Sequence, residues 1–306
     1  MNPVVSITVV TLNKVGLAKL CLGSIIEYTN IPFDLTIVDN GSIDELKSLY
    51  DNFDVLKKQM MDANEYCCNI NLVRFPENRY ICAATNVGFE NRQGQYFCFI
   101  PSDTIMTEGY ITKLLDGMSK YKLDGISPRW FEERHRIDIM DPYNSATAWG
   151  EEFKHGKVFG YNKRDDCEFN WMVGIMYLIK RELWEKVGGW DEQFKLSVMD
   201  NDFCWRAMVH GFQLGIINDV WIFHAGPVTR MDEQQNPGYQ KIGDQDWKKF
   251  EEKWGTNPDD ISFLWQLQKE GVIRKKTSAD APDAGIPKEI KEKRITTPEY
   301  KFKSDY

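Results

Sequence analysis

Two short apolar runs, VVSITVVTL at Val4–Leu12 and LTIVDNGS at Leu35–Ser42, lie on either side of a helical pattern at Leu17–Tyr28. Both runs are short, rich in β-branched residues and nearly all apolar, which is typical of strands buried on both faces of a parallel sheet. A strand, a helix and a second strand within about forty residues form a βαβ unit. The N-terminal segment therefore predicts an α/β fold.

The same alternation continues along the chain. We expect further strands at Leu72–Phe75, Tyr96–Ile100, Asp124–Trp130, Trp171–Ile179 and Gln213–Phe223. We expect helices at 43–66, Ile81–Arg92, Thr107–Tyr121, Lys180–Val187, Asp200–His210, Asp244–Trp254 and Ile261–Lys269. Residues 131–168 interrupt this rhythm, and long loops in a compact domain usually carry function, so we expect them to shape a site.

The bulk composition is that of a globular protein, with 42% hydrophobic and 27% charged residues. A net charge of −8 argues against a general surface for nucleic acid or other polyanions. Seven cysteines without a Cys-x-x-Cys pair favour free thiols in a reducing compartment. The first apolar stretch is a strand and no apolar run has the length of a membrane span, so we expect neither a secretory leader nor a transmembrane segment. We expect a cytoplasmic protein, with peripheral attachment to a membrane left open.

Polar side chains gather where the expected strands end. In an open α/β sheet, ligands bind outside the carboxyl ends of the strands, so these positions predict one shared ligand site. The polar residues at these ends are Thr11, Asn13, Asp39, Asn40, Ser42, Ser102, Asp103 and Thr104.

Asp39 suits a nucleoside, because its carboxylate can accept from a base imide or a ribose hydroxyl. Turn formation by Asp-Asn-Gly-Ser is the alternative explanation for the same residues. The chain has no glycine-rich phosphate loop, so the charge of a diphosphate has to be neutralised by other means, such as a divalent metal. Asp103 and His224 each follow an apolar run and are candidate ligands for that metal. Helix capping by Asp103 and a structural role for His224 are the alternatives.

The order and spacing of several segments resemble the large inverting family-2 glycosyltransferases of the GT-A fold, rhamnosyltransferase-like bacterial members in particular. The similarity covers roughly residues 5–229. The segments are SITVVTLN, LTIVDNGSID, PENRYICAATNVGFENRQGQYFCFIPSDT, MVGIMYLIKRELWEKVGGWDEQF, MDNDFCWRAMVHGF and IFHAGPVT. Each segment is weak evidence alone, and their common order makes the resemblance specific. It implies a GT-A type, Rossmann-like, mixed but mostly parallel sheet flanked by helices, with a C-terminal helical extension.

The resemblance also implies roles for single residues. The donor nucleotide-diphosphate sugar would be bound by Thr11, Asn13, Asp39, Ser42, Asn78, Asn86, Ser102 and Asp103. A Mn²⁺ or Mg²⁺ ion would be held by Asp103 and His224. Asp200 would be the general base, and the acceptor would lie near Trp171, Gly174, Trp190, Asp191 and Asp202.

Two departures from the family pattern weaken these assignments. The first acid of the metal-binding Asp-x-Asp element is replaced, because the triplet here is Pro101-Ser102-Asp103. Met199 occupies the place of the glutamate that precedes the base. Capping of a helix remains the alternative role for Asp200, and Asp202 is the alternative base.

The resemblance divides the chain into a glycosyltransferase domain at 1–229, a helical extension at 230–271 and an extended or disordered tail at 272–306. Within the domain, 1–104 would bind the nucleotide and 105–229 the acceptor. We expect a glycan or a lipid-linked acceptor, and a nucleic-acid acceptor is a weaker alternative. Two competing functions stay open: a sugar nucleotidyltransferase, and a non-catalytic protein that binds a nucleotide sugar or a glycan.

Overall fold

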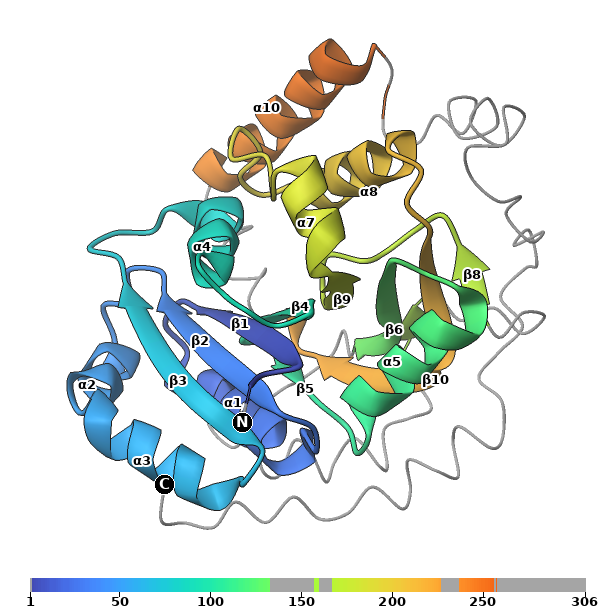
Figure 1. Cartoon of the computed structure of the whole chain (residues 1–306). Helices are drawn as coiled ribbons and strands as arrows, with labels where there is room; N and C mark the ends of the chain where they lie inside the picture. Colours follow the sequence, from blue (N-terminus) through green and yellow to red (C-terminus); the bar gives the residue numbers. More distant parts are fainter. Residues whose placement is uncertain (1, 133–156, 160–166, 227–236, 256, 258–306) are drawn as a thin grey trace.

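The computed structural model describes residues 2–132, 157–159, 167–226, 237–255 and 257 (Figure 1). A twisted sheet runs through the molecule, and helices cover both of its faces. Within the described residues the sheet has ten strands, with β3-β2-β1-β4-β9-β6-β10-β5 as its main path. β7 pairs with β6, and β8 pairs with β10. The predicted mixed α/β fold is confirmed.

The N-terminal half repeats the strand–helix unit. Its elements are β1 (Val5–Thr11), α1 (Val15–Tyr28), β2 (Phe33–Asp39), α2 (Glu45–Asp51), α3 (Phe53–Ala63), β3 (Cys67–Arg74), α4 (Tyr80–Phe89) and β4 (Tyr96–Pro101). β1 pairs in parallel with β2 and β4, and β2 pairs in parallel with β3. Every residue of β1 and β2 is buried, the polar Ser6, Thr8 and Thr36 included, as expected of strands that are covered on both faces.

The C-terminal half adds strands of both directions. Its elements are β5 (Thr104–Ile105), α5 (Tyr110–Tyr121), β6 (Gly125–Glu132), β7 (Lys157–Phe159), β8 (Cys167–Phe169), β9 (Tyr177–Lys180), α7 (Arg181–Val187), α8 (Met199–Val209), β10 (Leu214–His224) and α10 (Pro237–Trp254). β9 is antiparallel to both β4 and β6, so β6 runs in the direction of β4. β10 is parallel to β6, so its carboxyl end lies at the same edge as the ends of β1, β2 and β4.

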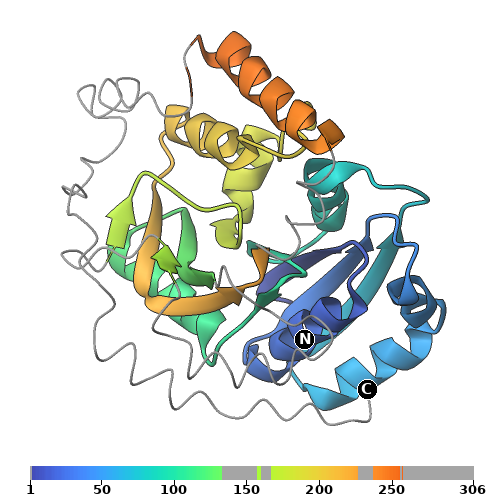
Figure 2. The ribbon, with the colours of Figure 1, turned by 180° about the vertical axis from the view of Figure 1, so that it is seen from behind.

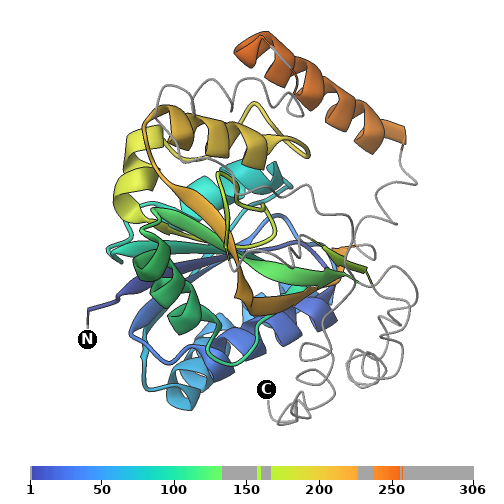
Figure 3. The same cartoon turned by 90° about the vertical axis from the view of Figure 1, so that its right-hand side faces the viewer.

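Two apolar clusters lie under the helices, one on each face of the sheet. Helices α1, α2, α3 and α5 contribute to one cluster, and α4, α7, α8 and α10 contribute to the other. Figures 2 and 3 show the resulting layers, with α10 on the outside of α8. Among the described helices none is long and apolar enough to cross a membrane.

Several expected elements differ from the structure. The expected strand Trp171–Ile179 is wrong in its first half, because only Tyr177–Lys180 is a strand. Before this strand, the backbone N–H of Val173 donates to a side-chain atom, Ser127 Oγ, at 3.0 Å. The expected helix at 43–66 is two helices that break at Asn52. The expected helix Ile261–Lys269 and the tail 272–306 lie outside the described residues.

Candidate active site

Asp39 ends β2 and is held by its own chain. Asp39 is only 2% exposed. The N–H of Ser42 donates to Asp39 Oδ1 at 3.0 Å, and Arg74 Nε donates to Asp39 Oδ2 at 3.2 Å. The turn that was the alternative explanation for these residues is therefore present, and the Arg74 guanidinium of β3 binds the other carboxylate oxygen.

The loop after β1 and the loop after β2 are bonded to each other. Asn13 N–H donates to Ser42 Oγ at 2.9 Å, and Ile43 N–H donates to Asn13 Oδ1 at 2.9 Å. Asn13 has a φ of 52°, in the left-handed region that asparagine tolerates better than most residues. The structure thus brings two of the expected donor-binding residues, Asn13 and Ser42, into direct contact.

Thr11 lies beneath these loops and is completely buried. Its hydroxyl accepts from Tyr50 Oη at 3.2 Å and donates to the Val38 carbonyl at 3.3 Å. Burial raises the pKa of Tyr50, so this phenol keeps its proton and remains a donor. Thr11 therefore supports the loop from below.

Asn78 closes the other side of the Asp39 loop. Its Oδ1 accepts from Asn40 Nδ2 at 2.9 Å and from the Tyr80 N–H at 2.8 Å. Gly41 has a φ of +86°, and a Cβ there would lie 2.4 Å from the Glu77 carbonyl carbon. Only glycine allows the two loops to approach this closely.

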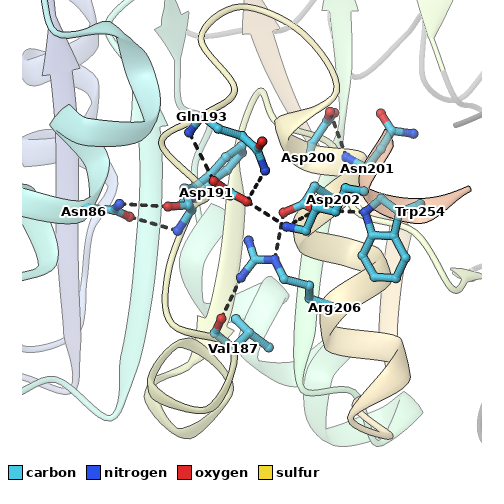
Figure 4. Close-up of polar contacts among 11 residues, drawn as sticks. Asn86, Val187, Asp191, Gln193, Asp200, Asn201, Asp202, Arg206 and Trp254 are labelled. Atoms are coloured by element: carbon cyan, nitrogen blue, oxygen red, sulfur yellow. Dashed lines mark hydrogen bonds and ion pairs between the residues drawn. The ribbon is translucent and has the colours of Figure 1, made fainter. Parts of the chain in front are cut away.

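Asn86 contacts a different segment. Its side chain exchanges hydrogen bonds with the Trp190 backbone, donating to the carbonyl and accepting from the N–H, both at 2.9 Å (Figure 4). It also donates to Glu192 Oε1 at 3.0 Å. Asn86 thereby ties α4 to the segment that follows α7, and the structure does not join it to the Asp39 loop.

Asp103 and His224 lie side by side. β5 is antiparallel to β10, and its register places Thr104 opposite His224. Ala225 N–H donates to the Asp103 carbonyl at 2.8 Å, and His224 Nε2 lies 3.4 Å from Asp103 Oδ2. A Cβ at Gly226 would lie 2.2 Å from His224 Cε1, so this glycine lets the chain fold closely over the imidazole.

These two side chains fit a divalent cation. Asp103 is 15% exposed and His224 is 7% exposed, so the carboxylate is partly open to solvent and the imidazole is buried beside it. Two neighbouring ligands of an ion with bonds of about 2.1 Å lie roughly 3 Å apart, close to the separation found here. Across the described ranges no cluster of three or more His, Cys, Asp or Glu residues suited to a metal is present. Among the described residues, Asp103 and His224 are therefore two candidate ligands, and a divalent ion bound there would need further oxygen ligands.

Asp200 reaches the same edge of the sheet through Gly174. β9 is antiparallel to β4, so β9 begins where β4 ends, and Gly174 lies just before β9. Gly174 N–H donates to Asp200 Oδ2 at 3.3 Å, and Asn201 N–H donates to Asp200 Oδ1 at 3.0 Å. Ser102 lies at this edge as well, since its N–H donates to the Val10 carbonyl at 3.2 Å. The Asp200 side chain is half-buried in the first turn of α8.

A sequence profile described as glycosyl transferase family 2 matches residues 6–187. The chain belongs to glycosyl transferase family 2. It is 22% identical to the chondroitin synthase of Pasteurella multocida strain Pm70 in a 266-residue alignment that covers 78% of this chain and 26% of that protein. It is 24% identical over 120 residues to the glycosyltransferase GlyA of Streptococcus pneumoniae serotype 4, covering 39% of this chain and 16% of that one. This family-2 chain thus spans only a small part of both relatives.

Solved structures confirm the GT-A type of fold for this family-2 glycosyltransferase. Residues 1–349 of S. aureus TarS align with a TM-score of 0.52 and 13% identity, over 74% of this chain and 61% of that one. The mannosyltransferase PcManGT of Pyrobaculum calidifontis, solved with GDP-Man and Mn2+, aligns with a TM-score of 0.51 and 17% identity. That alignment covers 74% of this chain and 57% of that one. The rhamnosyltransferase-like subtype stays a prediction.

The expected acceptor residues of this glycosyltransferase have diverse surroundings. Trp171 is half-buried. Trp190 is 3% exposed, and its indole N–H donates to the Tyr177 hydroxyl inside an aromatic cluster. Asp202 is fully buried and accepts from Arg206, Lys253 and Trp254 (Figure 4). Neither Trp190 nor Asp202 has surface to offer an acceptor in this conformation.

Asp191 keeps more surface, with 27% of its side chain exposed. Burial alone would raise the pKa of Asp191, but hydrogen bonds from Lys253 and Gln193 outweigh it and lower the pKa. Lys253 Nζ lies 2.7 Å from Asp191 Oδ2 and, on its other side, 2.7 Å from Asp202 Oδ1. One lysine of α10 thus joins two of the expected acceptor residues.

Sequence reasoning missed two residues of this region. Arg74 pairs with Asp39, and the parallel register Asp39↔Arg74 would have revealed it once β2 and β3 were aligned. Asp246 of α10 accepts three backbone N–H groups from the segment before α8. The sequence feature that could have indicated burial of Asp246 is its position four residues before Phe250, on the apolar side of α10.

Proposed function

We propose that this glycosyltransferase moves a sugar from a nucleotide-diphosphate donor to an acceptor hydroxyl with inversion at the anomeric carbon. The acceptor oxygen forms a bond to the anomeric carbon while the bond from that carbon to the diphosphate breaks. Asp200 takes the proton of the acceptor hydroxyl, and the nucleoside diphosphate leaves with the bonding electrons. Removing the proton as the oxygen attacks is the usual work of a general base.

The position of the Asp200 carboxylate carries this proposal. Gly174 N–H holds Asp200 Oδ2 at 3.3 Å at the edge of the sheet where β4 ends. Asp103 follows β4 by two residues and lies against His224 at this edge. A displacement at one carbon needs the attacking and leaving groups on opposite sides of that carbon, so a base and a leaving-group site near the same edge of the sheet support this proposal.

The remaining residues divide between donor binding and support. Asp103 and His224 would hold a Mn²⁺ or Mg²⁺ ion, which when bound neutralises the diphosphate charge as it leaves. The loops carrying Asn13, Asp39 and Ser42 bind the nucleoside, because they lie at the carboxyl ends of the two central parallel strands. Thr11 and Asn78 brace those loops from either side.

The acceptor is a glycan or a lipid-linked sugar. The relatives with similar sequence are a chondroitin synthase and a glycosyltransferase, which favours a saccharide acceptor over nucleic acid. A net charge of −8 also argues against a nucleic-acid acceptor. UDP- and GDP-sugars are the donors to screen first, because UDP-GlcNAc and GDP-Man occur in structures of similar fold.

The substitution Asp200→Asn tests the base. It keeps the shape of the side chain and its acceptor oxygen but removes the proton-accepting charge. We expect kcat for transfer or donor hydrolysis to fall at least ~10²-fold, in line with general-base contributions, while nucleotide affinity stays within a few-fold. Asp219→Asn is the matched control, because Asp219 is an exposed acid on β10. Normal turnover in Asp200→Asn would refute the assignment, and nucleotide binding without any turnover in the wild type would favour the non-catalytic alternative.

The substitution Asp103→Ala tests the metal. It leaves His224 as the single ligand of the pair, so Mn²⁺-dependent binding of UDP or GDP should weaken by at least ~10-fold, because a metal ligand is lost. Calorimetric titration with and without EDTA measures the effect directly. Nucleotide binding that is equally tight in EDTA for both proteins would show that the diphosphate is held without a metal.

A further inference from the structure

The segment that leads into the Asp200 helix has a strained turn. Val198 immediately precedes α8 and has a φ of 56°. Left-handed backbone is rare and strained for a β-branched residue, so it persists only where neighbouring structure holds it. Val198 is 5% exposed and its side chain belongs to the apolar cluster that includes α8 and α10.

A single carboxylate on α10 holds the chain just before this turn. Asp246 Oδ2 accepts the N–H groups of Lys195, Leu196 and Ser197 at 2.8, 2.8 and 3.1 Å. Three successive N–H groups aimed at one oxygen form an anion-binding nest, and here the anion comes from the protein itself. Asp246 is fully buried, so its charge requires these donors, and Lys249 Nζ adds a contact at 3.3 Å to the other oxygen.

The helix that carries Asp246 is itself fixed against α8. Phe250, four residues later on the same face, is completely buried. Its ring packs edge-on against Trp205 of α8, with ring centroids 5.0 Å apart. This packing fixes α10 against α8, and so it keeps the Asp246 carboxylate next to the segment that precedes Val198.

We propose that Asp246 is a positioning residue for Asp200. By holding residues 195–197 it sets where α8 begins, and the first turn of α8 presents Asp200 to Gly174 N–H. Without Asp246 the Val198 turn relaxes and the base shifts away from the edge of the sheet. A displacement of about 1 Å costs up to about 10²-fold in rate while donor affinity is kept, because the nucleotide loops lie on other elements. This inference rests on the proposed role of Asp200 as base.

The experiment compares Asp246→Ala, Asp246→Asn and the control Asp244→Ala. Asn keeps an oxygen that can accept from the nest, whereas Ala removes it. Asp244 is exposed on the same helix two residues earlier. Donor hydrolysis is measured with Mn²⁺ and the UDP- or GDP-sugar that the wild type hydrolyses fastest, and UDP or GDP titration counts the folded sites. We expect kcat per folded site to fall ~10-fold to ~10²-fold in Asp246→Ala with KM for the donor within a few-fold, and to recover in part in Asp246→Asn.

A second comparison asks whether the effect passes through Asp200. In the Asp200→Asn background, Asp246→Ala should change kcat by less than about 3-fold, because residues that act as a unit are not additive. Hydrogen exchange of the 195–198 amides should accelerate in Asp246→Ala and not in Asp244→Ala. Additive losses, or a kcat loss explained wholly by fewer folded sites, would overturn the positioning role. Normal kcat in Asp246→Ala would also overturn it and leave the base assignment intact, whereas full activity in Asp200→Asn would overturn the proposed function itself.

Discussion

Loss of the Asp202 side chain should strongly destabilise this protein. Its carboxylate is 0% exposed, and it receives Arg206 Nε at 2.7 Å, Lys253 Nζ at 2.7 Å and the Trp254 indole N–H at 3.0 Å. Asp202→Ala leaves one 17% exposed guanidinium and one 29% exposed ammonium without the acid between them. Removing one partner from a buried ion pair costs about 3–5 kcal/mol, because the remaining charge stays poorly hydrated.

The control is Asp191→Ala, which removes a carboxylate that shares the same lysine. Asp191 is 27% exposed, so water can replace the lost contact and we expect a loss below about 1 kcal/mol. Urea denaturation followed by tryptophan fluorescence gives both values, provided that the m-value is unchanged. Comparable small losses in Asp202→Ala and Asp191→Ala would refute the reasoning that burial sets the magnitude.

Two further substitutions test other parts of the fold. Asp34 lies on β2, where burial raises its pKa although Arg92 lies 3.8 Å away and lowers it. Because the pKa of Asp34 is higher in the folded state than in the unfolded state, the protein loses stability as pH rises from the unfolded-state pKa through the folded-state pKa. Asp34→Asn should therefore raise the Tm at pH 7. It should have little effect at about pH 3.5, which is below the ordinary aspartate pKa. Gly88→Ala should destabilise the protein by roughly 1–3 kcal/mol through overpacking, because its Cβ would lie 2.1 Å from Thr8 Cγ2 where α4 crosses β1. Thermal unfolding measures both effects, and an unchanged Tm in either variant at pH 7 would contradict its argument.

The parallel core was predictable from the sequence because its signal is local. β1 and β2 are buried along their whole length, and short, β-branched, mostly apolar runs are typical of such strands. The same rule placed Asp39 and Asp103 at one edge, since parallel strands end together. The proximity of Asp103 and His224 then followed from their places after apolar strands, and the structure brings them within 3.4 Å.

The supporting residues were harder to predict because their signal is tertiary. The position of Asp246 on the apolar side of α10 indicates that this acid is buried, but nothing within the helix shows that it accepts three N–H groups from residues 195–197. Asp202 next to the expected base reads as a second acid of the site, whereas Arg206 and Lys253 draw it into the core. The apolar run at Trp171–Ile179 has the composition of a strand throughout, and only the Ser127 bond to Val173 shows where the ladder stops.

The direction of β9 decides whether Asp200, the proposed base, lies at the same edge of the sheet as Asp103 and His224, the residues proposed to bind the diphosphate through a metal. β9 has four residues, so with three steps of about 3.3 Å its first and last residues lie roughly 10 Å apart. Because β9 runs against β4, the chain before it, with Gly174, lies where β4 ends and Asp103 follows. A parallel β9 would put Gly174, and the Asp200 carboxylate bonded to it, at the opposite edge. The reversed strand therefore brings Asp200, the proposed base, to the edge where the parallel strands place the proposed nucleotide loops. The proposed role of Asp246 is to keep Asp200 at that edge from the outer side of α8.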